Sequence, residues 1–329
     1  MAMRGWPLIK VLPVKTNLQF VKFAKPFGLL SAVLVIASII GCFWPGLNMG
    51  IDFRGGASME VSKPAGQVVA LDELRAAVGE LGLGDVGVQG IARRGTDVDD
   101  GSTAIVRFQI PEGQDQTAVV QQVETAITEA VGEVTYSGVS VVGSKVSGEL
   151  FTSGLMALGL AVVLMFVYIW FRFEPQFGFG AIVGLLHDVI LVFGLIVIMR
   201  LEFSLNMVAA ILTVIGYSMN DTVVVFDRLR ENLRKYKTMP LREVIDLSIN
   251  ETLSRTIITG VTAIMVLAAL AVFGGEALFG FSIALMAGII IGTYSSIYVG
   301  APIILLWGVK RGGAADDATP VKLGMASRP

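Results

Sequence analysis

Six long runs of apolar residues, almost free of charged side chains, constrain the fold of this chain more than any other feature. A helix needs about 20 such residues to cross a bilayer, where only helices and closed barrels satisfy their backbone hydrogen bonds. The sequence therefore predicts a polytopic α-helical membrane protein with six transmembrane helices. The first covers residues 27–44, and the others lie within 150–307, at roughly 150–171, 177–199, 203–226, 256–273 and 278–307.

The basic residues predict how these helices are oriented in the membrane. Residues 1–26 contain five basic residues and no acidic one, and residues 228–255 contain seven basic residues. Short basic segments remain on the cytoplasmic side of a membrane. We therefore expect both termini, including the tail 308–329, in the cytoplasm, together with a linker helix at about 228–253 that lies along the membrane surface.

The segment 45–149 is too charged to lie in a bilayer, and in this topology it falls on the outer side of the membrane. It holds 15 of the 27 acidic residues and only 7 of the 25 basic ones. Strand-like alternation and helical spacing follow one another in the order βαββαβ, which predicts a small ferredoxin-like α+β domain in the periplasm. The expected strands lie near 57–62, 86–91, 103–110 and 134–142, and the expected helices near 70–81 and 114–131.

The composition argues against several classes of function. With 25 basic and 27 acidic residues, the chain has no surplus of positive charge for binding a nucleic acid. A single cysteine excludes an internal disulfide framework, and the only histidine has no second histidine beside which to bind a metal. The glycine-rich run at 50–56 lacks the lysine of a phosphate-binding loop and is expected to be a turn. We therefore expect no cofactor and no enzymatic activity.

Charged side chains inside the predicted membrane helices are candidates for function, because each costs about 2.5–3.5 kcal/mol to insert. Asp221 lies in the fourth run with Tyr217 one turn before it and Asn220 beside it, and Arg255 precedes the fifth run. The opposite directions of these two helices place Asp221 and Arg255 near each other. Two interpretations remain open: a structural ion pair, or a carboxylate whose proton occupancy is controlled by burial and by the arginine.

A second candidate is the dipeptide His187-Asp188 in the middle of the third run. Gly180 and Gly184 share a helix face with Asp188, which favours close packing against another helix. The histidine is either a hydrogen-bonded core residue or part of a proton relay. Small residues at every fourth position of the sixth run indicate helix packing only: Ala284, Gly288, Gly292 and Ser296.

Four sequence segments together resemble one family. These are GIDFRGG at 50–56, SGEL at 147–150, GYSMNDTVVVFDR at 216–228 and LSRT at 253–256. They resemble the SecF family of bacterial protein-export subunits, and the resemblance covers nearly the whole chain. It makes Gly50, Asp52, Gly55 and Gly56 members of a family motif.

The resemblance implies a location in the bacterial inner membrane and a twelve-helix assembly with a SecD partner, similar to resistance-nodulation-division exporters. It implies action beside the Sec translocon (SecYEG) and accessory membrane subunits, with unfolded preproteins as substrates and the proton motive force as the energy source. It makes Asp221 the proton-carrying carboxylate and Arg255 its partner. The residues alone leave two alternatives, half of a proton-coupled small-solute exporter and a scaffold subunit without proton coupling.

Overall fold

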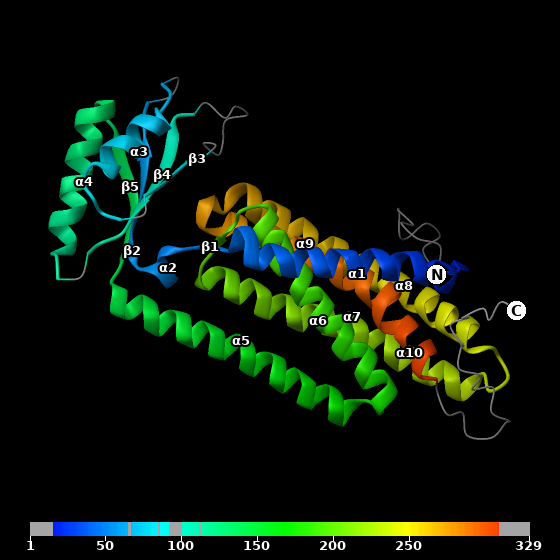
Figure 1. Cartoon of the computed structure of the whole chain (residues 1–329). Helices are drawn as coiled ribbons and strands as arrows, with labels where there is room; N and C mark the ends of the chain where they lie inside the picture. Colours follow the sequence, from blue (N-terminus) through cyan, green and yellow to red (C-terminus); the bar gives the residue numbers. More distant parts are fainter. Residues whose placement is uncertain (1–15, 65–66, 85, 92–100, 112, 309–329) are drawn as a thin grey trace, which may run out of the picture.

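The computed structural model describes residues 16–64, 67–84, 86–91, 101–111 and 113–308. A bundle of long helices makes up most of it, and a small domain of helices and strands lies at one end of that bundle (Figure 1). The chain leaves the bundle once to form this domain and returns to it through one long helix.

Six helices are long and apolar enough to cross a membrane, as the sequence predicts. The first span is α1 (Ala24–Gly41) with the short turns η1 (Val21–Phe23) and η2 (Cys42–Gly46) at its ends. The next four are α5 (Ser144–Arg172), α6 (Pro175–Ile198), α7 (Leu205–Lys235) and α8 (Leu241–Phe273). The last is α9 (Gly275–Ser295), continued by η3 (Ser296–Gly300) and α10 (Ala301–Trp307).

The spans differ in how deeply they are buried. About half of the most apolar part of α6 and of α7 is covered by other helices, 50% and 56%, against 6% for α5 and 17% for α8. Accordingly α5 runs along the outside of the bundle (Figure 1). The inner helices α6, α7 and α9 are therefore the place where polar side chains can be kept away from lipid.

The link between the fourth and fifth spans differs from the prediction. No separate helix covers 228–253; instead α7 continues to Lys235, α8 begins at Leu241, and only residues 236–240 lie between them. A charged sequence shows that the chain has left the bilayer, but a helix satisfies its backbone hydrogen bonds equally well in water. Three side-chain bonds join the helix ends, from Asn232 to Ser248 at 3.0 Å and to Glu251 at 2.7 Å, and from Arg228 to Glu251 at 2.7 Å.

The small domain is one antiparallel sheet covered by two helices. Its elements are β2 (Gly56–Ser62), α3 (Leu71–Gly79), β3 (Gly87–Ile91), β4 (Thr103–Phe108), α4 (Gln116–Val131) and β5 (Thr135–Val142). The strands are ordered β3-β4-β2-β5. Leu74 of α3 and Val123 of α4 have no exposed surface, and neither do Met59 and Val106 on the sheet. These apolar faces form a core separate from that of the membrane helices.

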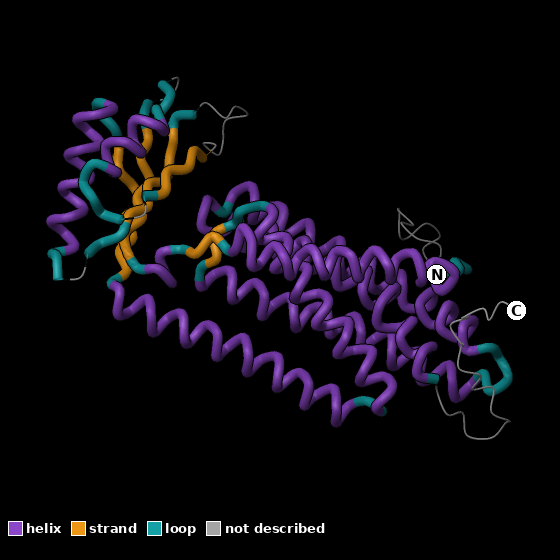
Figure 2. The backbone as a smooth tube through the Cα atoms, viewed as in Figure 1, coloured by secondary structure: helices purple, strands orange, loops and turns teal. Residues whose placement is uncertain are grey.

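A short junction connects the two parts. Strand β1 (Asn48–Met49) pairs in parallel with β6 (Glu202–Phe203), which precedes α7, and Figure 2 shows this pair between the helices and the larger sheet. The one-turn helix α2 (Ile51–Arg54) follows β1 directly. Arg107 on β4 forms an ion pair with Glu202 on β6, so the sheet is also tied to the start of α7 through side chains.

Candidate functional site

Asp221 lies on the inner side of α7 and is only 3% exposed. Its Oδ2 atom has no hydrogen-bond partner within the described residues, and the buried hydroxyl of Tyr217, one turn earlier, has none either. Thr293 of α9 faces the carboxyl group. Buried polar atoms are nearly always paired in proteins, so two unpaired oxygens on one helix face mark this position as unusual.

Arg255 lies near Asp221 but does not form a salt bridge with it. Its side chain is exposed on α8, and among the described residues no ion pair within 4.0 Å joins the two groups. The arginine still acts on the carboxyl group through its charge. The structural ion pair that the sequence left open is therefore not formed in this structure, because the guanidinium group lies at the surface of the bundle.

Several polar residues of α7 and α8 lie at the surface of the described bundle. Asn220 on α7 and Arg255 on α8 are exposed, and so are Thr213 and Thr262. The two threonine hydroxyls donate to carbonyl groups of their own helices, at 2.8 Å and 3.0 Å, so they need no other partner. Within the described residues, the exposed side chains of Arg255 and Asn220 form no such hydrogen bond to their own helices.

Asp188 is the centre of a hydrogen-bond network between three inner helices. It has no exposed surface, and its Oδ1 atom lies 2.9 Å from Nδ1 of His187. Its Oδ2 atom accepts bonds from Ser218 on α7 and, at 2.7 Å, from Ser295 on α9. Both carboxyl oxygens are thus occupied, and the network ties α6 to α7 and α9.

The network continues from His187 toward the first span. The imidazole ring stacks against the ring of Tyr294, with centroids 6.1 Å apart. The Tyr294 hydroxyl donates to the carbonyl of Phe27 at 2.7 Å and lies 2.8 Å from the Ser31 hydroxyl. The Nε2 atom of His187 is buried and has no partner in the described part of the chain.

Small residues let the inner helices approach as closely as the sequence predicts. A side chain at Gly292 would lie 3.1 Å from Ser218, and one at Gly288 would collide with Val214, so α9 lies directly on α7. A side chain at Gly180 would lie 2.8 Å from the carbonyl oxygen of Gly300. The interpretation of these stripes as packing surfaces is confirmed.

The glycine-rich motif forms the junction beside the sheet and contains the helix α2, not a simple turn. Asp52 accepts a hydrogen bond at 2.9 Å from the backbone N–H of Leu205, the first residue of α7, and so satisfies one free donor of that helix. A side chain at Gly50 would lie 2.6 Å from Glu202, and Gly56, at φ +117°, lies against the carbonyl oxygen of Phe108. The motif therefore links the sheet to the helix that carries Asp221.

The sequence did not reveal the partners of the predicted site residues. Ser218, Ser295, Tyr294 and Ser31 lie within long apolar runs, and nothing local shows which helix each one faces. Within the described residues no three metal-ligating side chains come together. The arrangement offers hydrogen bonding and proton binding, with one fully bonded carboxyl group and one that is only partly bonded.

Comparison with known proteins places this arrangement in context. A family profile described as "Protein export membrane protein SecD/SecF, C-terminal" matches residues 122–310, and one described as "SecD/SecF GG Motif" matches residues 45–62. The protein translocase subunit SecF of Cereibacter sphaeroides is 45% identical over 314 residues, which cover 94% of this chain and 95% of that protein. SecF of Rickettsia rickettsii is 41% identical over 313 residues, which cover 93% of this chain and 96% of that protein.

Solved structures show the same arrangement of elements. The crystal structure of SecDF from Thermus thermophilus, described as a translocon-associated membrane protein, matches 90% of this chain with a TM-score of 0.77 and 30% identity. A SecDF structure in a super-membrane-facing form matches with a TM-score of 0.62 and 29% identity. In both comparisons this chain spans 39% of the SecDF chain.

Proposed function

Because this chain belongs to the SecD/SecF family of protein-export membrane proteins, we propose that it is a SecF-type subunit that promotes the movement of unfolded secreted proteins across the bacterial inner membrane. The proton motive force is the proposed energy source. The chain spans 39% of the SecDF chain, so a SecD-type partner would supply the remainder, and the pair would act beside the Sec translocon.

The proposed topology places both termini in the cytoplasm and the small domain in the periplasm. Six spans bring the two ends of the chain to the same side, and one cavity at the end of the bundle away from the sheet is lined by residues 16–19 together with Pro302, Ile303, Leu305 and Leu306. We assign the domain to the ferredoxin-like class from its βαββαβ order and its central β4-β2 pair. Its described residues contain no cluster of metal-ligating side chains, and we propose that the domain acts as a lever or a partner surface.

The observation that carries proton coupling is the environment of Asp221. A buried carboxyl group with an unpaired oxygen can bind a proton, and a nearby arginine stabilises the ionised form. We propose that Asp221 alternates between a protonated form, with Arg255 at the surface, and an ionised form toward which Arg255 moves. One charge crossing 100 mV provides about 2.3 kcal/mol, which is sufficient to shift a two-state equilibrium.

We propose that a change in the protonation of Asp221 affects other parts of the molecule through two contacts of α7. Ser218, one turn before Asp221, is bonded to Asp188, so a shift of α7 would alter its contact with α6 and α9. At the other end of α7, Asp52 holds the first residue of the helix to the junction beneath the sheet. We propose that α7 transmits the proton-dependent movement to the periplasmic domain through this second contact.

Exposed polar residues on the spans support a membrane partner. Asn220 and Arg255 lie at the surface of the described bundle, and such groups are costly to expose to lipid. A SecD-type chain covering this face would provide polar partners for both. It would also enclose the proton site between two halves of an assembly.

The decisive experiment replaces Asp221 by asparagine, which preserves the shape of the side chain and removes its ionisation. We expect Asp221→Asn to insert and to co-purify with the SecD partner, but to lose the part of preprotein export that depends on an imposed proton gradient in membrane vesicles. The matched control is Asp227→Asn on the same helix, where the carboxylate pairs with Arg172 at the helix end. Normal proton-dependent export by Asp221→Asn would refute the coupling and favour a scaffold.

A further inference from the structure

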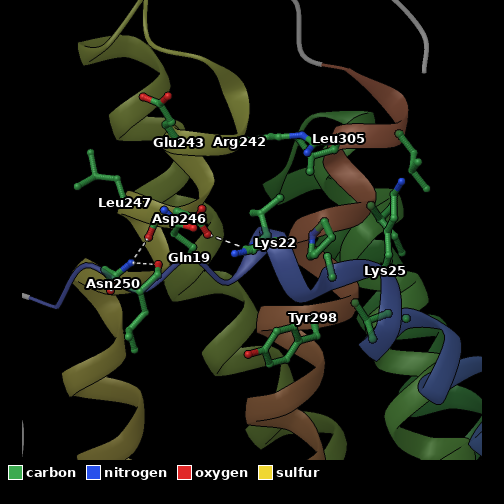
Figure 3. Close-up of a pocket in the computed structure, with 18 of the residues that line it drawn as sticks. Gln19, Lys22, Lys25, Arg242, Glu243, Asp246, Leu247, Asn250, Tyr298 and Leu305 are labelled. Atoms are coloured by element: carbon green, nitrogen blue, oxygen red, sulfur yellow. Dashed lines mark hydrogen bonds between the residues drawn. The ribbon is translucent and has the colours of Figure 1, made fainter. Parts of the chain in front are cut away.

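A cavity of about 1040 Å³ is lined by residues of η1, α1, α8 and α10. Figure 1 shows that α10 and the start of α1 lie at the end of the bundle opposite the sheet. Three parts of the chain enclose it: the segment leading into α1, the first turns of α8, and the last span around η3 and α10 (Figure 3). Neither Asp221 nor Asp188 lines it, nor do the residues bonded to Asp188, and it meets the network only at Ser31, whose hydroxyl lies beside that of Tyr294. The proposed export mechanism does not use it.

The segment that leads into α1 is joined to α8 by hydrogen bonds between its backbone and side chains of α8. The N–H of Leu18 donates to Asn250 at 2.9 Å, and the Asn250 amide returns a bond to the Leu18 carbonyl at 2.9 Å. The N–H of Val21 donates to Asp246, also at 2.9 Å. One wall of the cavity is therefore held in place, and the carboxylate of Asp246 is engaged by the backbone instead of by a lysine or arginine.

Three cations line the cavity without partners. Lys22, Lys25 and Arg242 are exposed, and within the described residues none of them forms an ion pair or a side-chain hydrogen bond. Figure 3 shows them on different elements, with Arg242 coming from α8 and the two lysines from the chain around the start of α1. Besides Asp246, the only acidic residue in the described lining is Glu243. The unpaired positive charge is suited to an anionic group.

The remaining wall of the cavity is apolar and reaches the outer surface of the bundle. Leu305 and Leu306 of α10 line it, and Leu306 is 82% exposed at the surface of the bundle. On the α1 side, Gly28 also lines the cavity, and a side chain at that position would meet no atom within 4 Å. A phospholipid at the membrane surface has a charged phosphate group and apolar acyl chains. The basic groups at the helix end match the phosphate, and the exposed apolar wall beside them matches the acyl chains.

We propose that this cavity binds an anionic phospholipid of the phosphatidylglycerol type. Its phosphate would lie among Lys22, Lys25 and Arg242, and its acyl chains would follow Leu305 and Leu306 along α10. The lipid would thereby bridge the first, fifth and sixth spans at one end of the bundle. Only the choice of leaflet rests on the topology proposed above; the site itself does not depend on proton coupling.

The test measures phosphatidylglycerol binding to the full-length chain by native mass spectrometry from detergent, with phosphatidylcholine as the neutral reference. We expect phosphatidylglycerol to bind at least tenfold more tightly than phosphatidylcholine. In Lys22→Gln/Lys25→Gln/Arg242→Gln each lost charge should weaken binding about fivefold, giving roughly a hundredfold in total. Equal binding of the two lipids, or wild-type binding by this variant, would overturn the proposal.

A matched control removes three cations from the same end of the molecule but outside the cavity. Arg234→Gln/Lys235→Gln/Lys237→Gln loses the same charge, and none of its positions lines the cavity. We expect its affinity for phosphatidylglycerol to stay within about threefold of wild type, as expected where no specific contact is lost. An equal loss in both triple variants would show attraction to general charge and would contradict a defined site.

Further experiments distinguish a lipid from other possible occupants of the cavity. Gly28→Phe keeps every charge and fills the open space, so it should weaken phosphatidylglycerol binding at least tenfold while the melting temperature without lipid stays unchanged. Inorganic phosphate at the same concentration should not displace the lipid, because it lacks the acyl chains. Displacement by phosphate, or a tenfold gain in lipid binding on deletion of residues 309–329, would assign the cavity to a free anion or to the chain's own tail.

Discussion

Two buried carboxyl groups on neighbouring helices differ in one respect, the number of partners around them. Asp188 on α6 is 0% exposed and Asp221 on α7 is 3% exposed. Asp188 is bonded at both oxygens by His187, Ser218 and Ser295, whereas Asp221 has an oxygen without a partner and a cation that does not touch it. A carboxyl group with hydrogen bonds at both oxygens stabilises one arrangement of the helices. A carboxyl group with an unbonded oxygen can gain or lose a proton without breaking a hydrogen-bond network.

The largest effect expected from this difference is on stability. Asp188→Ala leaves two serine hydroxyls and one imidazole without their acceptor in the core, so we expect a loss of about 3–5 kcal/mol in the free energy of unfolding. Asp221→Ala removes a poorly bonded group and should change stability by less than about 1 kcal/mol. Denaturant unfolding of both variants in the same micelles measures the contrast. Equal losses would remove the distinction between the two acids.

A smaller effect should come from a residue that touches one acid and neighbours the other. Ser218→Ala removes one hydrogen bond to Asp188, which we expect to cost about 1.5–3 kcal/mol of unfolding free energy, as for bonds to charged groups. Export should still respond to the proton gradient, because Asp221 is untouched. Thr213→Ala on the same helix, whose hydroxyl bonds only its own helix, is the control. Loss of gradient dependence in Ser218→Ala would show that the two acids act as one unit.

The sequence predicts the six spans and the positions of both acids because these depend on local signals. An apolar run of sufficient length becomes a membrane helix whatever its neighbours are, and a charge inside it stands out at once. The difference between the acids is not local. It depends on the rotation of α7 and α9, which points Ser218 and Ser295 toward Asp188 and leaves Asp221 facing Thr293.

The same reasoning explains why the linker helix expected at 228–253 is wrong, and why the ion pair between Asp221 and Arg255, which the sequence left open, is not formed here. The charged link at 228–253 marks the end of the bilayer, and the sequence does not show that α7 and α8 continue as helices beyond it. The sequence places Asp221 and Arg255 near each other only through their depth along the spans. Depth does not fix the direction of a long side chain, and Arg255 lies at the surface.

The smallest effect tests whether α7 joins the acids to the small domain. Asp52→Ala removes the bond to the first N–H of α7 and should lower stability by about 1 kcal/mol, as for the loss of a helix cap. Asp72→Ala, whose carboxylate is 98% exposed in a surface pair with Arg75, should change stability by less than about 0.5 kcal/mol. If α7 carries the movement, Asp52→Ala should also lower proton-driven export beyond its effect on stability, while the Asp72 variant exports normally. Equal export by the two variants at matched protein levels would restrict the proton-dependent change to the membrane interior and leave the junction a purely structural link.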